Sequence, residues 1–346
     1  MTQPAPDSRY QARVLVNQAR LTDISDGGVR TQKLLTAALE ADPHHHDTRL
    51  LLERLYQTFI PRWHFPMLGD AGRNRAYAEA INATVREGDI VLDIGSGAGL
   101  TAMLAARAGA KHVYACENQP LIAQAATKII AANGLSDRIT IIPKWSHDLK
   151  IGEDLPEPAD VVISEIVDTV LLGEGAIPTL VHAMGALAKP NARTVPERGI
   201  LYAQPIESET LFRTWRLQTA EGFDLSHFHQ FANVAELTPN DVAAYGLKAL
   251  GPPVALFEFD FARPSLKDEK AEAELICDRA GEFHAVLISF DLHLTSEICV
   301  TSGIDSDGHW GRTAFLCETE RRMTPGDTVG VQASHDCAAL NVTIGL

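Results

Sequence analysis

The sequence predicts an α/β protein in which a doubly wound parallel sheet is followed by an antiparallel β-barrel and preceded by a short helical segment. Strand and helix patterns alternate from about residue 89 to residue 195, and glycines crowd the turn after the first strand. Beyond Pro196 the helical periodicity fades, and short strand-like segments replace it. Alternation of this kind is typical of parallel sheets with helices on both faces, whereas successive strands are typical of antiparallel barrels or sandwiches. With 346 residues the chain can hold two or more domains, since a domain usually has roughly 100–200 residues.

Two helices are expected near the N-terminus. They correspond to TQKLLTAALEADP and DTRLLLERLYQTFIP, which carry apolar residues at helical spacing and each end at a proline. The opening stretch MTQPAPDSRY is expected to be a disordered tail. Residues 1–55 are therefore expected to form an N-terminal helical segment that resembles one tetratricopeptide hairpin and could contact a partner or a second copy.

A histidine triplet, His44 to His46, lies in the link between these two helices. Histidine binds several metals, but no second cluster of ligands accompanies the triplet in the sequence. We therefore expect a solvated turn there and predict no metal site.

The parallel sheet is expected within residues 56–195. Its strands correspond to DIVLDIGSG, HVYACE, RITIIPK and ADVVISE, which are short and rich in apolar, β-branched residues. The helices correspond to LTAMLAARAGA, LIAQAATKIIAANG and GAIPTLVHAMGALAKP. This order predicts parallel strands joined by crossover helices.

The antiparallel domain is expected within residues 196–346. Its strands correspond to RGILYAQPIES, VALFEFDF, AELICDRAG, FHAVLISFDLHLT, RTAFLCE, DTVGVQASHD and ALNVTIGL. A polar, partly helical insertion at about residues 222–250 interrupts them.

Composition excludes some classes of partner. The formal net charge is −15. Because binding of phosphates needs basic patches, nucleic acid is not expected as a partner. An acidic field instead favours a cationic substrate. No apolar run approaches the roughly 18 residues that cross a bilayer, so no membrane association is expected. The five cysteines show no CxxC spacing, which indicates reduced thiols and a cytoplasmic location.

The first strand ends in a glycine turn, VLDIGSGAGL, which contains Asp93, Gly95, Gly97 and Gly99. Glycines there let the backbone turn tightly and approach a ligand closely. A dinucleotide fingerprint, GxGxxG, would place its third glycine where this chain has Leu100. The GxGxG spacing, with an acid two residues before it, favours S-adenosyl-L-methionine over a nicotinamide dinucleotide.

Glu117 ends the second strand, 22 residues after Gly95. A carboxylate at that position can accept hydrogen bonds from both hydroxyls of a ribose. Because dinucleotide sites also use such an acid, Glu117 is expected to bind the ribose without deciding between the two cofactors.

Two further acids, Glu165 and Glu174, lie nine residues apart in the apolar loop SEIVDTVLLGEG. Two carboxylates can hold the edges of one guanidinium through charge-assisted hydrogen bonds and polarise electron density toward one nitrogen. The apolar neighbours would exclude water and strengthen that grip. The loop therefore predicts a binding site for a cation.

Several motifs together resemble the protein arginine methyltransferase family, most closely its monomethylating, seventh-type branch (type III). HFPMLGDAGRNRAY resembles the family's helix before the first strand, with Met67, Asp70 and Arg73 in register. SEIVDTVLLGEGAIP resembles its double-glutamate loop, and DGHWGRTAFL resembles its threonine-histidine-tryptophan loop, with His309 and Trp310. VPERGILYAQPIES resembles the entry to its barrel, and EGFDLS lies where its dimerisation arm is found.

This resemblance, which covers about residues 63–346, implies a class I methyltransferase with a Rossmann-like sheet, a β-barrel substrate domain, a dimerisation arm and S-adenosyl-L-methionine as cofactor. It implies that Arg73 pairs with the cofactor's carboxylate. The residues expected at the cofactor are Met67, Arg73, Asp93, Gly95, Gly97, Gly99, Glu117, Trp145, Ser146 and Glu165. Those expected to be catalytic are Asp70, Glu165, Glu174 and His309. Those expected to bind substrate are Glu165, Asp168, Glu174 and Trp310.

The expected reaction is monomethylation of the guanidino nitrogen of arginine, in line at the sulfonium methyl and accelerated mainly by positioning. One glutamate, or the His309–Asp70 pair, would take the departing proton. The acceptor is an arginine of a protein or peptide, or free L-arginine, whose carboxylate could be bound by Arg62 or Arg312. A homodimer is expected.

The sequence is also compatible with three other interpretations. The chain could be a catalytically weak homologue that acts as a binding or scaffold protein through its N-terminal hairpin. It could methylate a small amine other than arginine. A nicotinamide-dependent dehydrogenase is disfavoured by Leu100 and by the antiparallel domain that follows.

Overall fold

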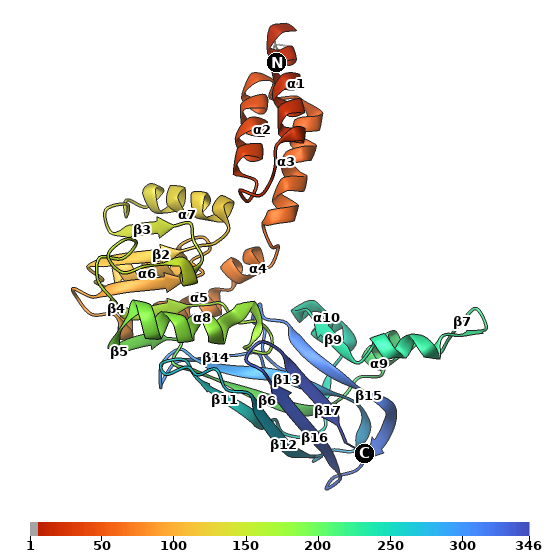
Figure 1. The fold of residues 1–346 in the computed structure, drawn as a ribbon. Coiled ribbons are helices and arrows are strands. Elements are labelled where there is room, and N and C mark those ends of the chain that lie inside the picture. The colour runs from red at the N-terminus through yellow and green to blue at the C-terminus, as the bar shows by residue number, and fades with distance from the viewer. Residues whose placement is uncertain (1–5, 346) are drawn as a thin grey trace.

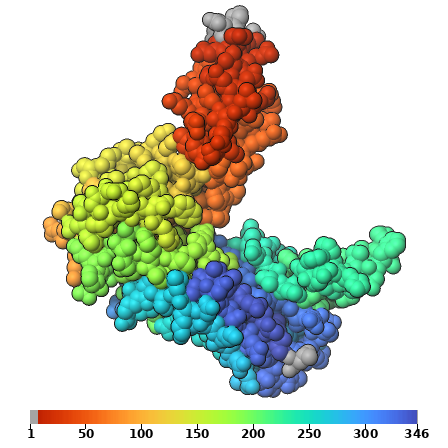
Figure 2. Space-filling view, in the orientation of Figure 1, coloured from red at the N-terminus to blue at the C-terminus, as the bar shows by residue number. Residues whose placement is uncertain are grey.

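The computed structural model describes residues 6–345 and arranges them in three parts (Figure 1). A helical part stands at one end, an α/β part follows, and an antiparallel β part lies at the other end. In the space-filling view the helical part rises as a column from the α/β part, and a green arm extends from the β part (Figure 2). The predicted order of N-terminal helices, a parallel sheet with helices and an antiparallel β region is confirmed. No helix among the described residues is long and apolar enough to cross a membrane.

The α/β part contains a five-stranded parallel sheet with strand order β3-β2-β1-β4-β5. The strands are β1 (Ile90–Ile94), β2 (His112–Cys116), β3 (Ile139–Ile142), β4 (Ala159–Ser164) and β5 (Ala188–Val195). The associated helices are α5 (Ala71–Thr84), α6 (Leu100–Arg107), α7 (Pro120–Ala132) and α8 (Ala176–His182). All five residues of β1 are buried, as expected for a central strand covered on both faces.

The strand order brings the predicted site segments together. Since β1 pairs with β2 on one side and with β4 on the other, their carboxyl ends lie next to one another. Gly95 follows β1, Glu117 follows β2 and Glu165 follows β4. Three segments far apart in sequence therefore meet at one edge of the sheet, where ligands of such folds bind.

The β part contains a seven-stranded antiparallel sheet and a separate three-stranded one. The first has the order β10-β6-β13-β15-β9, with β11 paired to β6 and β14 paired to β13. Its strands are β6 (Arg198–Glu207), β9 (Val234–Leu237), β10 (Lys248–Ala249), β11 (Val254–Asp260), β13 (Gly281–His293), β14 (Cys299–Thr301) and β15 (Arg312–Met323). The second consists of β12 (Glu269–Ile276), β16 (Thr328–His335) and β17 (Leu340–Ile344).

The insertion at residues 222–250 is less separate from the sheet than the sequence indicates. Its strand β9 pairs with β15, and β10 pairs with β6. The arm itself carries α9 (Glu209–Trp215) and the short hairpin β7 (Thr219–Ala220) and β8 (Phe223–Asp224), and α10 (Pro239–Tyr245) leads back to the sheet (Figure 1). The apolar side chains of β9, Ala235 and Leu237, are buried, which explains why this segment joins the sheet.

The helical part contains three helices rather than two: α1 (Pro6–Leu21), α2 (Val29–Ala41) and α3 (His46–Phe59). The expected disordered tail is wrong for residues 6–10, which begin α1, while residues 1–5 lie outside the described residues. Proline is tolerated in the first turn of a helix, and Ala12, Val16 and Ala19 form a buried stripe that packs with α2. Tertiary burial therefore stabilises a segment whose composition alone resembles a tail.

The double-glutamate loop packs between the α/β part and the β part. Leu171 and Leu172 are fully buried in the core cluster that spans both parts. Leu171 lies against Gly199 of β6, where a Cβ atom would come within 2.6 Å of its Cδ1. Leu171 and Glu174 both have positive φ angles, 63° and 58°, which are strained for residues other than glycine. Burial of the two leucines offsets this strain and fixes the loop.

Replacing Leu171 with alanine should lower the free energy of unfolding by about 2–5 kcal/mol, the usual range for a buried leucine. Urea denaturation would measure the change. Leu266→Ala is the matched control, because Leu266 is 63% exposed and its loss should change stability by less than about 0.5 kcal/mol. Equal effects of the two substitutions would contradict the role given to Leu171.

Candidate active site

A cavity of about 380 Å³ opens at the carboxyl ends of β1, β2 and β4, beneath α3 and α4 (His64–Gly69). This volume is in the range of small-molecule sites, roughly 300–1,000 Å³. Eight of the ten predicted cofactor residues line it: Met67, Arg73, Gly95, Gly97, Glu117, Trp145, Ser146 and Glu165. Glu174 lines it as well.

The glycine turn forms the floor of the cavity. Gly95, Gly97 and Gly99 all have positive φ angles, of 70°, 50° and 81°. A Cβ atom on Gly95 would come within 2.5 Å of the Ile166 side chain. The turn therefore requires glycine at Gly95 both for its conformation and for the close approach of the double-glutamate loop.

Asp93 lies behind this turn and does not line the cavity. It accepts a hydrogen bond of 2.8 Å from the Thr101 hydroxyl, and burial raises its pKa to about 7. Gly99 likewise lies outside the lining, as the residue before α6. Both residues shape the turn, and the prediction that they contact a cofactor directly remains untested.

Glu117 is buried and held by backbone amides. Its Oε2 accepts a hydrogen bond of 3.1 Å from the Gly97 amide, and its Oε1 accepts one of 2.8 Å from the Gln119 amide. Carboxylate oxygens have further lone pairs, so the side chain can still accept hydrogen bonds from a ligand. The amides fix the orientation in which it would do so.

Glu165 is paired with an arginine of the chain itself. The Arg73 Nε donates to Glu165 Oε1 at 2.8 Å, and Arg73 Nη2 forms a second close contact with Oε2. Arg73 is buried and stacks over the ring of Tyr77 at 4.6 Å. The first glutamate of the loop is thus oriented by a two-point guanidinium contact.

Glu174 has no such partner. Its carboxylate is open to the cavity, and no ion pair to it occurs among residues 6–345. Desolvation, then the charges of Asp168 and Glu117, raise the pKa of Glu174. An acid that is surrounded by protein, has acidic neighbours and is held in a strained backbone conformation is suited to bind a cation.

Asp70 and His309 form a hydrogen-bonded pair that joins α5 to the β part. Asp70 Oδ2 accepts from the His309 amide and pairs with His309 Nδ1, both at 3.0 Å, while Oδ1 accepts from the Arg73 amide at 2.9 Å. Burial acts to raise the pKa of Asp70, but these hydrogen bonds lower it. Burial lowers the pKa of His309 despite the nearby carboxylate.

The arrangement suits the neutral imidazole. If Nδ1–H donates to Asp70, the other ring nitrogen is an acceptor, and it lies 3.9 Å from Glu165 Oε1. The pair therefore lies next to the glutamate that Arg73 holds, behind the wall of the cavity.

Trp310 and Asp168 do not line the cavity. Trp310 is buried against Phe290 and His309, with ring centroids 5.4 Å and 4.1 Å away. Asp168 Oδ1 accepts hydrogen bonds from the amides that follow it in the double-glutamate loop, at residues 170, 172 and 173. In the structure Trp310 packs against His309, and Asp168 holds the double-glutamate loop. Their contact with a substrate stays a prediction.

Sequence reasoning missed the residues that cover the cavity. Trp63 and His64 stack at 3.9 Å and line the cavity together with Phe59 at the end of α3. A cluster of aromatic rings just before Met67 was the available signal. Helix packing decides which of them face the site: Tyr56, one turn earlier, instead accepts a hydrogen bond from Gln32.

Family models match most of the chain. Residues 197–343 match the arginine methyltransferase oligomerization subdomain, and residues 75–207 match the ribosomal protein L11 methyltransferase model. The first match covers the β part and the second covers the parallel sheet.

Curated relatives extend the likeness to the whole chain. An arginine N(omega)-methyltransferase of Streptomyces achromogenes is 33% identical over 99% of this chain and 94% of its own length. Protein arginine N-methyltransferase 7 of Oryza sativa subsp. indica is 36% identical over 66% of this chain, and the Danio rerio protein is 30% identical over 78%. The chain spans only 35% and 44% of those two proteins.

Solved structures share the fold. The Trypanosoma brucei PRMT1 enzyme–prozyme heterotetrameric complex with AdoHcy has a TM-score of 0.71 at 24% identity, over 81% of this chain and 91% of that one. Arabidopsis thaliana protein arginine methyltransferase 10 has a TM-score of 0.66 at 22% identity, over 80% and 89%. At these identities the likeness concerns the fold alone.

Proposed function

Because the chain belongs to the protein arginine methyltransferase family, we propose that it transfers a methyl group from S-adenosyl-L-methionine to a guanidino nitrogen of arginine. The observation that carries this function is the cation-free carboxylate of Glu174, which faces the cavity near the guanidinium-paired Glu165. A site with one unpaired acid and acidic neighbours favours a cationic acceptor.

The residues of the cavity fit the cofactor. Glycine at Gly95 lets Ile166 and the double-glutamate loop close against the cavity floor, and the Gly97 amide orients Glu117. Glu117 would hold the ribose hydroxyls, Trp145 and Ser146 would flank the adenine, and Met67 would face the reacting end. When bound, the cofactor supplies an electrophilic methyl group on a sulfonium.

Arg73 serves two carboxylates in this proposal. Its Nε and Nη2 contact Glu165, and it lies in the cavity wall, where a ligand carboxylate could also reach it. Arginine has five N–H donors in a fixed fork, so one side chain can bind both groups. Arg73 thereby ties the position of the cofactor to the orientation of Glu165.

The acceptor guanidinium would bind between Glu165 and Glu174. The guanidinium stays protonated at neutral pH and its lone pairs are delocalised, so it needs polarisation before it can attack. Its arrival would lower the pKa of Glu174 again, because an opposite charge favours the ionised acid. Bidentate contacts would then localise density on the nitrogen that faces the methyl group.

A proton must leave the guanidinium as the new N–C bond forms. Glu165 can accept it directly, and the free ring nitrogen of His309 lies 3.9 Å from Glu165 Oε1. Asp70 stabilises the imidazolium that would result. The Asp70–His309 pair is therefore assigned the second step of proton removal.

The product is proposed to be monomethylarginine, as in the seventh-type branch. The double-glutamate loop is rigid: Asp168 accepts from three of its amides, and Leu171 and Leu172 are fully buried. A loop held in this way cannot move aside to admit the extra methyl that a second transfer would bring.

Two acceptor classes each have support. Free L-arginine is favoured by the relative matched over nearly its whole length, which is named an arginine methyltransferase. Protein arginine is favoured by the several relatives named protein arginine methyltransferases. Arg312 is excluded as the partner of a free carboxylate, because it is buried and donates to the carbonyls of Trp310, Gly303 and Ser306. Arg62 is exposed near the cavity and remains the candidate.

The wider organisation is also a proposal. Residues 1–55, 56–195 and 196–346 are proposed as the N-terminal, cofactor-binding and substrate domains. Helix α3 crosses the first boundary and ends at Phe59, and the last domain is proposed to close as a β-barrel with its arm. A cytoplasmic location is supported by five free cysteines. A homodimer is supported by the arm, where Phe223, Phe228 and Phe231 are each about 70% exposed.

Incubation with methyl-labelled cofactor and either L-arginine or arginine-rich peptides should show transfer of one methyl to one of the two. Mass spectrometry would identify the product. Abundant dimethylarginine would refute the monomethyl product. Transfer to another amine alone would favour the other small-molecule activity, and no transfer to any acceptor would favour a scaffold role.

Glu174→Gln should reduce methyl transfer by at least about 10²-fold, as loss of a key charge-binding group does elsewhere. It should leave stability and the thermal stabilisation by S-adenosylhomocysteine nearly unchanged. Glu165→Gln should also lower the free energy of unfolding, by about 3–5 kcal/mol, because it leaves buried Arg73 without its carboxylate. Glu153→Gln, at an exposed position, is the control. Full activity of Glu174→Gln would remove the basis of the proposed function.

Replacing Phe223, Phe228 and Phe231 together with serine should convert a dimer to a monomer in sedimentation experiments at micromolar concentration. Leu266→Ser removes a comparably exposed apolar side chain outside the arm and should leave the dimer intact. A wild-type monomer at that concentration would contradict the proposed homodimer.

A further inference from the structure

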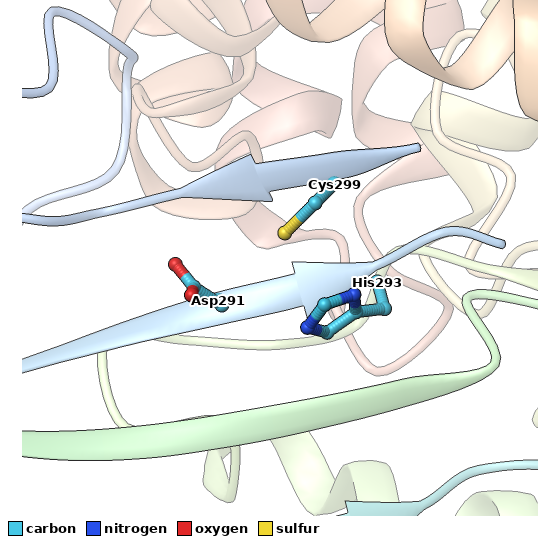
Figure 3. Close-up of side chains that lie close together, drawn as sticks. All are labelled: Asp291, His293 and Cys299. Carbon is cyan, nitrogen blue, oxygen red and sulfur yellow. The ribbon is translucent and has the colours of Figure 1, made fainter. Parts of the chain in front are cut away.

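A second cluster of reactive side chains lies in the β part, away from the cavity. Asp291 and His293 belong to β13, and Cys299 belongs to β14. One potential ligand atom from each residue lies within 4.8 Å of the other two. Figure 3 shows the Cys299 sulfur pointing toward the strand that carries Asp291 and His293. None of the three has a role in the proposed methyl transfer.

The register of the two strands explains why these side chains meet. His293 lies directly opposite Cys299 in the antiparallel pair, and Asp291 lies opposite Thr301. Residues two apart in a strand point to the same face, so Asp291 and His293 share the face of Cys299. Phe290 and Leu292 point to the other face and are fully buried in the core.

We propose that Asp291, His293 and Cys299 bind a zinc ion. Carboxylate, imidazole and thiolate are the three ligand types that zinc uses, and a thiolate disfavours the harder magnesium and calcium ions. Ligand atoms around tetrahedral zinc lie roughly 3.3–3.8 Å apart, given metal–ligand distances of about 2.0–2.3 Å. Small side-chain rotations would bring these atoms from within 4.8 Å to that spacing. Water would complete the coordination, because Cys299 is exposed.

Neighbouring groups orient the ligands. The Tyr202 hydroxyl lies beside Asp291, where it could donate the kind of outer hydrogen bond that fixes a metal-binding carboxylate. Arg198, the β6 residue paired with His293, is bound to Glu258 at 2.9 Å. Its guanidinium is thus partly neutralised beside the site.

Binding must release a proton. Cys299 is a free cysteine, and its thiol must ionise before the sulfur can bind a metal ion. Zinc coordinates the thiolate, and the displaced proton goes to solvent. Two charged groups act on the Cys299 thiol, Asp291 and Arg198.

The site would stabilise the loop that carries His309 and Trp310. From β14 the chain runs directly into this loop, where the Thr301 hydroxyl accepts from the Gly303 amide and the Ser306 hydroxyl donates to the Thr301 carbonyl. Arg312 closes the same loop through the carbonyls of Gly303 and Ser306. An ion that clamps β14 to β13 would therefore anchor one end of the loop behind the active site.

Metal analysis of the full-length protein, dialysed and then titrated with zinc, should give one tightly bound equivalent per chain. Cys299→Ser and His293→Asn should each weaken binding by at least about 10-fold, and cobalt should give a thiolate charge-transfer band that Cys299→Ser abolishes. Zinc should raise the melting temperature of the wild type but not of Cys299→Ser.

Glu297→Gln is the matched control, since this exposed acid lies in the turn between the ligands but outside the cluster. It should bind zinc like the wild type. Equal zinc affinity of the wild type and Cys299→Ser, or no stoichiometric binding at micromolar zinc, would overturn the proposal. Circular dichroism reports the folding of every variant, and this inference does not depend on methyl transfer.

Discussion

The buried contact between Arg73 and Glu165 is the interaction on which the candidate site depends. It joins α5 to the loop after β4, and both side chains are almost wholly withdrawn from solvent. Desolvating two ions is costly, so such a pair is retained only where geometry and further hydrogen bonds compensate. Here the Arg73 amide donates to Asp70, which in turn holds His309. One arginine therefore links three segments that meet only in the folded chain.

The electrostatics of the cavity follow from that arrangement. Glu165 is neutralised by Arg73, whereas Glu174 has Asp168 and Glu117 as its charged neighbours. The two glutamates look equivalent in the sequence but differ in the structure. The first is oriented and partly neutralised, and the second carries an unfavourable charge that a cation would relieve. This division of roles explains how a pair of acids can bind one guanidinium and still polarise it unevenly.

Features of the site that depend on residues close together in the sequence could be predicted from sequence patterns. The glycine turn and Glu117 follow strands that are readable as apolar runs, and the parallel sheet brings them together by its strand order. The positions decided by packing between distant segments were not predictable. Helix α1 forms because Ala12 and Val16 are buried against α2. The composition of the first residues does not reveal this packing, so a disordered tail was expected there. Trp310 and Asp168 likewise depend on neighbours in three dimensions, and they lie outside the cavity that the motif alone associates with them.

The cluster of Asp291, His293 and Cys299 is a further feature that could not be predicted from the sequence. Asp291, His293 and Cys299 match no familiar spacing, and no metal site was predicted from the sequence. Only the pairing of His293 with Cys299 across β13 and β14 brings the thiol to the imidazole. A shift of one residue in that register would turn Cys299 to the opposite face and bury it among apolar side chains. Burial of Phe290 and Leu292 sets which face of β13 carries Asp291 and His293, and Val300, opposite Leu292, packs against the same core from β14. Packing of the core thus determines the chemistry of the opposite face.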